Sequence, residues 1–429
     1  MRYLLAPLVV ALWTGCGSPE RRGGDDVEVD ACVGLECRIT NCTARGMPDT
    51  TISGTVFAPN GTLALYGVTV YIPNSDPGPL PDGVACSQCQ NALPGGSVAQ
   101  MLSGADGKFM LTKVPDGVNV PLVIQVGKWR RRVDIPEVLA CQDNVLPPNV
   151  TSLPKNKLEG DLPKIAITTG GCDALECLVR RLGVDAKEFT TEAGTGRINL
   201  YNSGGASGTA DGTPLPTGDS LWGDLTKLKK YDIAAFSCEC SPHSAATPTM
   251  MNNVKAFADL GGRVFMSHYN AQWISGSGSA PQPVWSSVAT CNVDTTPIST
   301  VGTIDQVNNP KGAAFATWMT NVMASSGAGT FTITQGRESC TMVDNTKAER
   351  WVYVQESAGQ IPQNFQFTTP QESPKDNRCG KVVFSDMHVA SDFSSGNFPS
   401  GCSATPLSAQ EKALAFMFFD VASCVGTIL

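Results

Sequence analysis

The chain has 429 residues, 39 acidic and 31 basic, and its net charge of -8 argues against nucleic acid as a partner, because neutralising phosphates requires clustered Lys and Arg. This length exceeds what one hydrophobic core usually organises, so two domains behind a leader are predicted. The 16 cysteines are too many for a reducing cytoplasm and favour an oxidising, extracytoplasmic compartment.

The first 15 residues are typical of a signal peptide, because Arg2 precedes an apolar run over residues 3–13 and small residues follow before Cys16. The segment LWTGC, residues 12–16, resembles a bacterial lipobox. That resemblance implies that Cys16 is lipidated and anchors the exported protein to a membrane, with the outer membrane expected. Ordinary cleavage, with Cys16 in a disulfide, is the alternative. No later stretch of the sequence approaches the ~18 uninterrupted apolar residues of a spanning helix.

Residues 16–50 are predicted to form a lipidated tether and a cysteine-rich lead-in. The tether is polar and charged and has no hydrophobic period. Cys32, Cys37 and Cys42 then follow at equal spacing, without a nearby histidine or a fourth cysteine. Disulfides are therefore favoured over a zinc knuckle.

Residues 51–146 are predicted to be all-β. Apolar residues alternate with polar ones over 68–72 and 122–126, and turn signals such as Asn60-Gly61 stand between such segments. The motifs GTV (54–56), YGVTV (66–70), DGKF (106–109) and VPDG (114–117) resemble those of the carboxypeptidase regulatory-like domain. The resemblance implies a small transthyretin-like β-sandwich that serves as a spacer or adhesive module.

Two other features of this segment carry predictions. The inserted loop over residues 73–97 holds the motif Cys86-x-x-Cys89. A structural disulfide, for example with Cys141, is favoured over a redox role, because the motif does not lie in a thioredoxin-like βαβ unit. The one dense basic run, residues 128–132, is expected to be a solvated strand edge.

Residues 147–163 are rich in Pro and Lys and are predicted to be a linker.

Residues 164–429 are predicted to form a doubly wound, flavodoxin-like α/β domain. The central unit is a short apolar strand at 233–236, a helix that ends at Gly261-Gly262, and a second strand at 264–266. An earlier strand at 165–169 and a later one ending near His388 extend the sheet, with an antiparallel extension expected from strands near 331–333 and 351–354. A helix over 408–421 closes the chain, with Ser408 and Glu411 as its capping box.

Polar residues follow several of these strands and are predicted to meet at the carboxyl edge of the sheet, where open α/β sheets bind ligands. All three histidines of the chain are among them. The candidate site residues are Cys238, Glu239, Cys240, His243, His268, Tyr269, Asp386 and His388. Because neighbouring strands lie only about 4.8 Å apart, His268 and His388 are expected within roughly 10 Å of each other.

The segments KIAITTGG, YDIAAFSCE, ADLGGRVFMSHYN and GKVVFSDMH resemble the class I glutamine-amidotransferase-like fold, in its ThuA-like branch. The whole chain also resembles cysteine-rich lipoproteins of uncharacterised function from myxobacteria. The amidotransferase family places its nucleophile in a G-x-C-x-G elbow, where this chain has MSHYN over residues 266–270. It follows a later strand with His-x-Glu, where this chain has His388-Val389-Ala390. Only His388 carries over, so the resemblance does not imply glutamine hydrolysis.

Three interpretations of the site remain open. Cys238 or Cys240 is a thiolate activated by a histidine for acyl transfer; or His268 and His388, with a carboxylate or thiolate, hold a divalent metal; or the histidines bond backbone while the cysteines form disulfides. The third interpretation, in which the histidines bond backbone and the cysteines form disulfides, requires no cofactor. If Cys16 is lipidated, an odd number of cysteines remains, so at least one thiol is free or bonded to another molecule.

The function expected from these observations is binding of a polysaccharide or another surface component, without catalysis. Trp222, Trp273, Trp285 and Tyr269 fall in or near the predicted edge loops and are candidates for stacking on sugar rings, although core packing is the more common use of any one such residue. The alternative is an extracytoplasmic hydrolase that uses a Cys/His or a His-metal site. A disulfide between Cys379 and Cys402 is also predicted, because the two cysteines bracket the strand that ends at His388.

Overall fold

The computed structural model describes residues 32–91, 93–275, 283–292, 296–327 and 329–426. The predicted signal peptide, the predicted lipidation site Cys16 and the predicted tether before Cys32 lie outside this range. Within it, no helix combines the length and the apolar character needed to cross a bilayer.

The first half of the described chain contains two small β-sheets. The strand order is β4-β1-β7 in one sheet and β3-β2-β5-β6 in the other. Alternate residues of β4 are buried, because side chains along a strand point to opposite faces of the sheet, whereas most of β2 and the second half of β5 are buried on both faces. The strands are β1 (Thr51–Thr55), β2 (Thr69–Pro73), β3 (Ser97–Leu102), β4 (Lys108–Thr112), β5 (Gly117–Val126), β6 (Trp129–Val138) and β7 (Asp143–Val145).

Short helical turns flank these sheets, namely η1 (Gly34–Arg38), η2 (Thr43–Arg45) and α1 (Pro148–Thr151). Cys32 pairs with Cys37 in a disulfide, as the lead-in predicts. Cys42 pairs with Cys141, so the proposed partnership of Cys141 with the CxxC loop is wrong. The basic run also differs from its prediction. Although β6 is an edge strand, Trp129 and Arg130 are buried, because this edge faces the second half of the chain.

The second half is a mixed α/β domain built on a ten-stranded sheet of order β15-β14-β17-β18-β19-β12-β11-β8-β10-β9. Neighbours from β19 to β9 run parallel, whereas β14, β15, β17 and β18 form the expected antiparallel extension. Its strands are β8 (Ile165–Thr169), β9 (Phe189–Thr190), β10 (Ile198–Asn202), β11 (Ile233–Phe236), β12 (Arg263–Ser267), β14 (Ile298–Ile304), β15 (Thr330–Gly336), β17 (Ala348–Glu356), β18 (Gly359–Thr369) and β19 (Gly380–Ser385); β13 (Ala289–Cys291) pairs with β16 (Cys340–Val343).

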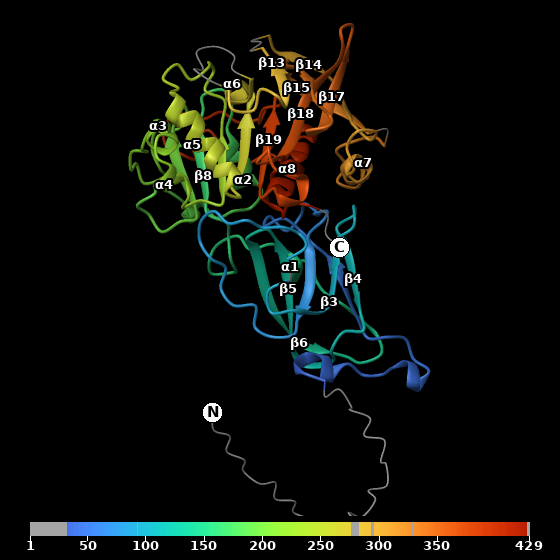
Figure 1. Cartoon of the computed structure of the whole chain (residues 1–429). Helices are drawn as coiled ribbons and strands as arrows, with labels where there is room; N and C mark the ends of the chain where they lie inside the picture. The colour runs from blue at the N-terminus through green and yellow to red at the C-terminus, as the bar shows by residue number, and fades with distance from the viewer. Residues whose placement is uncertain (1–31, 92, 276–282, 293–295, 328, 427–429) are drawn as a thin grey trace, which may run out of the picture.

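Helices pack on this sheet, and Figure 1 shows α5 and α8 on either side of the central strands. The helix α8 begins at the predicted capping box, in which Ser408 and Glu411 each satisfy a backbone N–H of the other. The helices are α2 (Leu175–Arg181), α3 (Gly218–Trp222), α4 (Leu225–Leu228), α5 (Pro248–Asp259), α6 (Ala271–Ser275), α7 (Gly312–Asn321) and α8 (Ala409–Ala422), with the turns η3 (Ala186–Glu188), η4 (His268–Asn270) and η5 (Lys375–Asn377).

The central unit β11–α5–β12 follows from local sequence. All four residues of β11 and all five of β12 are buried, as expected for strands covered on both faces. Thr247 caps the start of α5 through its side chain, and Pro248 occupies the first turn, where its missing N–H costs nothing. Gly261 follows the helix at a φ of +111°, a conformation that suits glycine.

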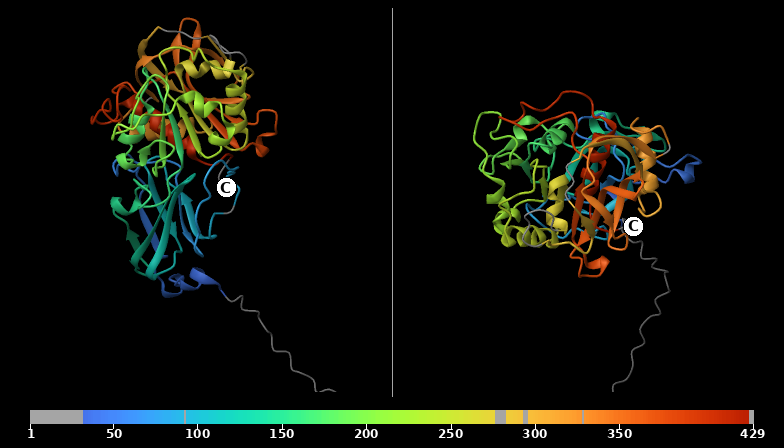
Figure 2. Two further views of the ribbon diagram at one scale, coloured as in Figure 1. Left: turned by 90° about the vertical axis from the view of Figure 1, so that its left-hand side faces the viewer. Right: turned by 90° about the horizontal axis from the view of Figure 1, so that it is seen from above.

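The two halves are packed together rather than separated by a free linker. Figures 1 and 2 both show the small sheets beneath the α/β domain. Trp129 of β6 contacts Phe418 and Phe419 of α8, with ring centroids 6.1 and 5.5 Å away. Within the predicted linker, Leu153 and Leu162 are buried in the same apolar cluster. This shared cluster means that each half contributes to the stability of the other.

Two disulfides also join the halves. Both start from the inserted CxxC loop, with Cys86 bonded to Cys379 and Cys89 bonded to Cys424. A structural role for this loop is therefore correct. The predicted Cys379–Cys402 pair is wrong, because Cys402 bonds Cys177 in α2. Proximity in sequence favoured the wrong pair, whereas Cys379 lies at the start of β19 and faces the neighbouring half.

Candidate functional site

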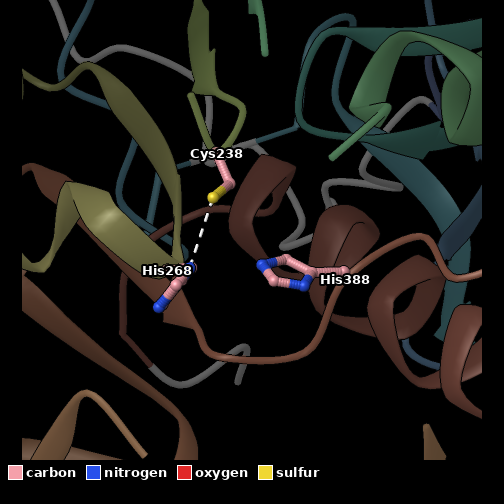
Figure 3. Close-up of side chains that lie close together, drawn as sticks. All are labelled: Cys238, His268 and His388. Carbon is pink, nitrogen blue, oxygen red and sulfur yellow. Dashed lines mark hydrogen bonds between the residues drawn. The ribbon is translucent and has the colours of Figure 1, made fainter. Parts of the chain in front are cut away.

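Three candidate residues come together because their strands are adjacent in the sheet. The strand β12 lies between β11 and β19, and all three run parallel in register. Cys238 follows β11, His268 follows β12 and His388 follows β19, so their side chains emerge at one edge. Figure 3 shows the thiol and the two imidazoles directed toward one another.

The three side chains are close enough to share one ligand. The Sγ atom of Cys238 lies 3.3 Å from Nδ1 of His268, and the two imidazole centroids are 5.2 Å apart. The prediction that the histidines lie within 10 Å is confirmed. One donor atom from each of Cys238, His268 and His388 lies within 4.8 Å of the others. All three residues are buried, with exposures of 0, 1 and 2%.

The hydrogen bonds of His388 fix which ring nitrogen can act as a ligand. Its Nδ1 is 3.2 Å from the carbonyl oxygen of Gln335, and a carbonyl only accepts, so Nδ1 carries the hydrogen. Burial, and then the charge of Arg337, lower the pKa of His388 to about 4, so the ring is neutral near pH 7. The Nε2 atom therefore holds a lone pair, and it has no hydrogen-bond partner among the described residues.

Among the described residues, Cys238 is the one free cysteine. The other described cysteines pair in seven disulfides. Burial raises the pKa of its thiol to about 12, and the nearby carboxylate of Asp173 adds to that shift. Backbone N–H groups of Cys240 and Tyr269 oppose the shift. The sulfur is thus protonated near neutral pH and can donate its hydrogen to Nδ1 of His268.

The backbone at His268 is strained. Its φ of +37° is unusual for a residue with a Cβ, and it occurs at the turn from β12 into η4. Such conformations cost about 1–3 kcal/mol and cluster at functional sites. This turn holds the imidazole against Cys238.

One segment, residues 172–173, contacts all three turns that carry the site. The N–H of Cys172 donates to the carbonyl of Cys238 at 3.0 Å. The carboxylate of Asp173 accepts from Ser267 Oγ at 2.5 Å and from the N–H of Val389 at 2.9 Å. Sequence reasoning missed Asp173, because an acidic residue before a helix already has a local electrostatic explanation. Burial raises the pKa of Asp173 to about 6.

Cys240, Glu239 and His243 do not join the three-residue cluster. Cys240 is bonded to Cys172, so it offers no thiol. His243 lies between two carboxylates, with Nδ1 2.9 Å from Glu239 and Nε2 3.0 Å from Asp219. Burial lowers the pKa of His243, but these two carboxylates outweigh it and raise the pKa overall. The group ties α3 to the loop that follows β11.

Asp386 and Tyr269 flank the cluster without entering it. Asp386 is fully buried, and its Oδ2 accepts from the backbone N–H of Ser339 at 2.9 Å, which anchors the segment after β15. Burial raises its pKa to about 7. The Tyr269 ring packs on His268, with centroids 4.0 Å apart. Both residues thus support the groups around the site.

The aromatic residues expected to stack on sugars are in the core. Trp222 and Trp273 have exposures of 0% and Trp285 of 2%, and Tyr269 is 8% exposed. Trp222 and Trp273 pack on each other and on Phe236 of β11. Core packing, the more common use of such residues, is confirmed for these four side chains, and the alternative of a sugar-binding platform at this edge is wrong.

Comparisons with known proteins give weak likenesses. No family model matches the sequence, and no curated protein matches it. A solved ThuA-like protein from Bacteroides uniformis is 12% identical and aligns over 52% of this chain and 80% of its own, with a TM-score of 0.31. A type II cohesin–X-dockerin complex from Acetivibrio cellulolyticus aligns at 15% identity over 33% of this chain and 75% of its own, with a TM-score of 0.17. At these scores neither likeness carries an argument about function.

Proposed function

We propose that Cys238, His268 and His388 hold a transition-metal ion in an extracytoplasmic protein. The observation that supports this most directly is the buried Nε2 of His388, whose lone pair has no hydrogen-bond partner in the described part of the chain and is directed at the thiol and the second imidazole. A buried polar atom without a partner is costly, and a metal ion would satisfy it. A thiolate with two neutral imidazoles is a ligand set that zinc and copper accept.

The supporting shell fits this proposal. A histidine ligand usually donates its second ring nitrogen to a carbonyl or carboxylate, which orients the ring. His388 does this through Gln335, and Gln410 holds the His388 backbone by donating to its carbonyl at 2.6 Å. Three protein ligands leave a fourth position open, from which a bound ion would polarise water or a carbonyl group as a Lewis acid.

The competing function is a Cys238 nucleophile activated by His268, as in acyl transfer. Their 3.3 Å contact favours it. It also requires a thiol that a substrate can reach, whereas Cys238 has no exposed surface and a pKa of about 12. Metal binding requires neither access for a large substrate nor a free thiolate, because the ion displaces the thiol proton.

Cobalt(II) titration of the purified full chain tests the metal centre. We expect one equivalent to bind and to give a thiolate-to-cobalt absorption band. The variants Cys238→Ala and His388→Ala should each weaken binding more than about a hundredfold, since even outer-shell changes cost about 10–100-fold.

His243→Gln is the matched control, because this histidine follows the same sheet edge but lies outside the cluster. Its affinity for cobalt should stay within a factor of two or so of the parent. Equal losses in all three variants, or no cobalt binding in the folded parent, would rule out the proposed centre. Rapid alkylation of Cys238 by iodoacetamide in the native protein would instead favour the nucleophile.

The seven disulfides are typical of a protein that works outside the cytoplasm. We further propose that Cys16 is lipidated and that residues 51–146 are a carboxypeptidase regulatory-like spacer between the membrane and a ThuA-like domain. The LWTGC segment supports the first part. Cys16→Ala should move the protein from the membrane fraction to the soluble fraction on ultracentrifugation; retention in the membrane would refute the anchor.

A further inference from the structure

A second candidate site lies where the two halves meet, at the opposite edge of the parallel sheet. A cavity of about 850 Å³ is lined there by the starts of β11 and β12, by β3 and the β5–β6 turn, and by the CxxC loop. This volume is within the range of small-molecule sites, which often lie between domains. Its walls are fixed by the Cys89–Cys424 disulfide, whose two cysteines both line it.

The charged groups in the cavity wall are already paired. Lys128 donates to the carbonyls of Pro81 and Gly83 and to the carboxylate of Asp232. The other oxygen of Asp232 accepts from the N–H of Lys164. Arg263 uses its guanidinium on four backbone carbonyls. None of the three is left to attract an ion, so a charged ligand has no evident counter-charge in this wall.

Carboxamide groups in the same wall retain hydrogen-bonding capacity within the described structure. Gln125 donates from Nε2 to the carbonyl of Gly127, while its buried Oε1 has no hydrogen-bond partner among the described residues. Gln100 accepts from Ser97 through Oε1, and no hydrogen bond of its NH₂ group is found within the described residues. Gln90 and Asn91 also line the cavity. Such groups offer both donors and acceptors without a charge.

Apolar surface lies beside these carboxamides, contributed by Leu93, Met101, Leu102 and Val126. A sugar has the matching chemistry, because it carries neutral hydroxyl groups at its edges and C–H groups on its faces. We propose that this cavity binds a neutral oligosaccharide. The ligand class is the one expected from the sequence, but the site is the junction of the halves rather than the carboxyl edge of the sheet.

Isothermal titration calorimetry of the detergent-solubilised full chain tests this site, with maltohexaose, cellohexaose and chitohexaose as probes and oligogalacturonate as an acidic comparison. We expect at least one neutral probe to bind and the acidic one to bind at least about tenfold more weakly. Gln125→Leu should weaken the neutral probe about tenfold, because it removes hydrogen bonds worth roughly 0.5–1.5 kcal/mol each.

Gln100→Leu is a second variant, at an exposed position of β3 where the substitution should not disturb folding. It should also weaken binding of the neutral probe. Gln355→Leu, at an exposed position near the end of β17, is the matched control and should bind as the parent does. Cys238→Ala should also bind as the parent does, so this result is independent of the metal centre. Absence of binding to all neutral probes, preference for the acidic one, or an affinity of both the Gln125 and Gln100 variants equal to that of the parent would overturn the proposal.

Discussion

Zinc binding by the full chain should tighten about tenfold for each unit of pH between 7 and 9. The reason is that the metal must displace the proton of Cys238, whose thiol pKa is about 12, so the protonated form dominates throughout this range. His388, with a pKa of about 4, is already neutral there and adds nothing to the slope. The pH dependence of zinc binding is therefore expected to come from deprotonation of the Cys238 thiol.

Competition with a zinc-binding dye, corrected for the protonation of the dye itself, measures this slope. Cys238→Ala should bind weakly and with little dependence on pH, since no thiol proton is then displaced. A parent protein whose affinity is flat from pH 7 to 9 would mean that the Cys238 sulfur is not a ligand, even if zinc binds.

Removing both disulfides between the halves should destabilise the protein far more than removing either of them alone. Cys89–Cys424 spans 335 residues and Cys86–Cys379 spans 293. Loop-closure entropy puts the constraint from such a long loop at about 5–6 kcal/mol in the unfolded chain. With one of the two still in place, the other closes only about fifty residues, so its single removal should cost about 4 kcal/mol.

Denaturant unfolding of variants with both cysteines of a pair changed to Ala measures these costs. The pair Cys32–Cys37 is the matched control, because it spans only 5 residues and its removal should cost about 2 kcal/mol. If the four-cysteine variant lost no more stability than this control, packing between the halves would hold them together without help from the disulfides.

The site was predictable from sequence because its geometry follows from strand adjacency. The apolar run of β11 and the glycines after α5 mark a parallel unit, and polar residues just past parallel strands share an edge. The partners of the cysteines were not predictable, because Cys379 and Cys86 meet only through packing of the two halves. The burial of Trp222 and Trp273 could likewise not be decided from the sequence alone, since an aromatic residue near a loop suits both the core and a binding surface.

The burial of Cys238, His268 and His388 has a consequence for the rate at which a metal would exchange. With exposures of 0, 1 and 2%, the donor atoms cannot be reached from solvent without movement of the surrounding turns. Those turns are tied to residues 172–173 by a backbone hydrogen bond and by the Asp173 carboxylate. Release of an ion would therefore wait for local opening, a rare event in well-packed structure. Cobalt or zinc added to the folded protein would therefore equilibrate with the site slowly, on the timescale of that opening.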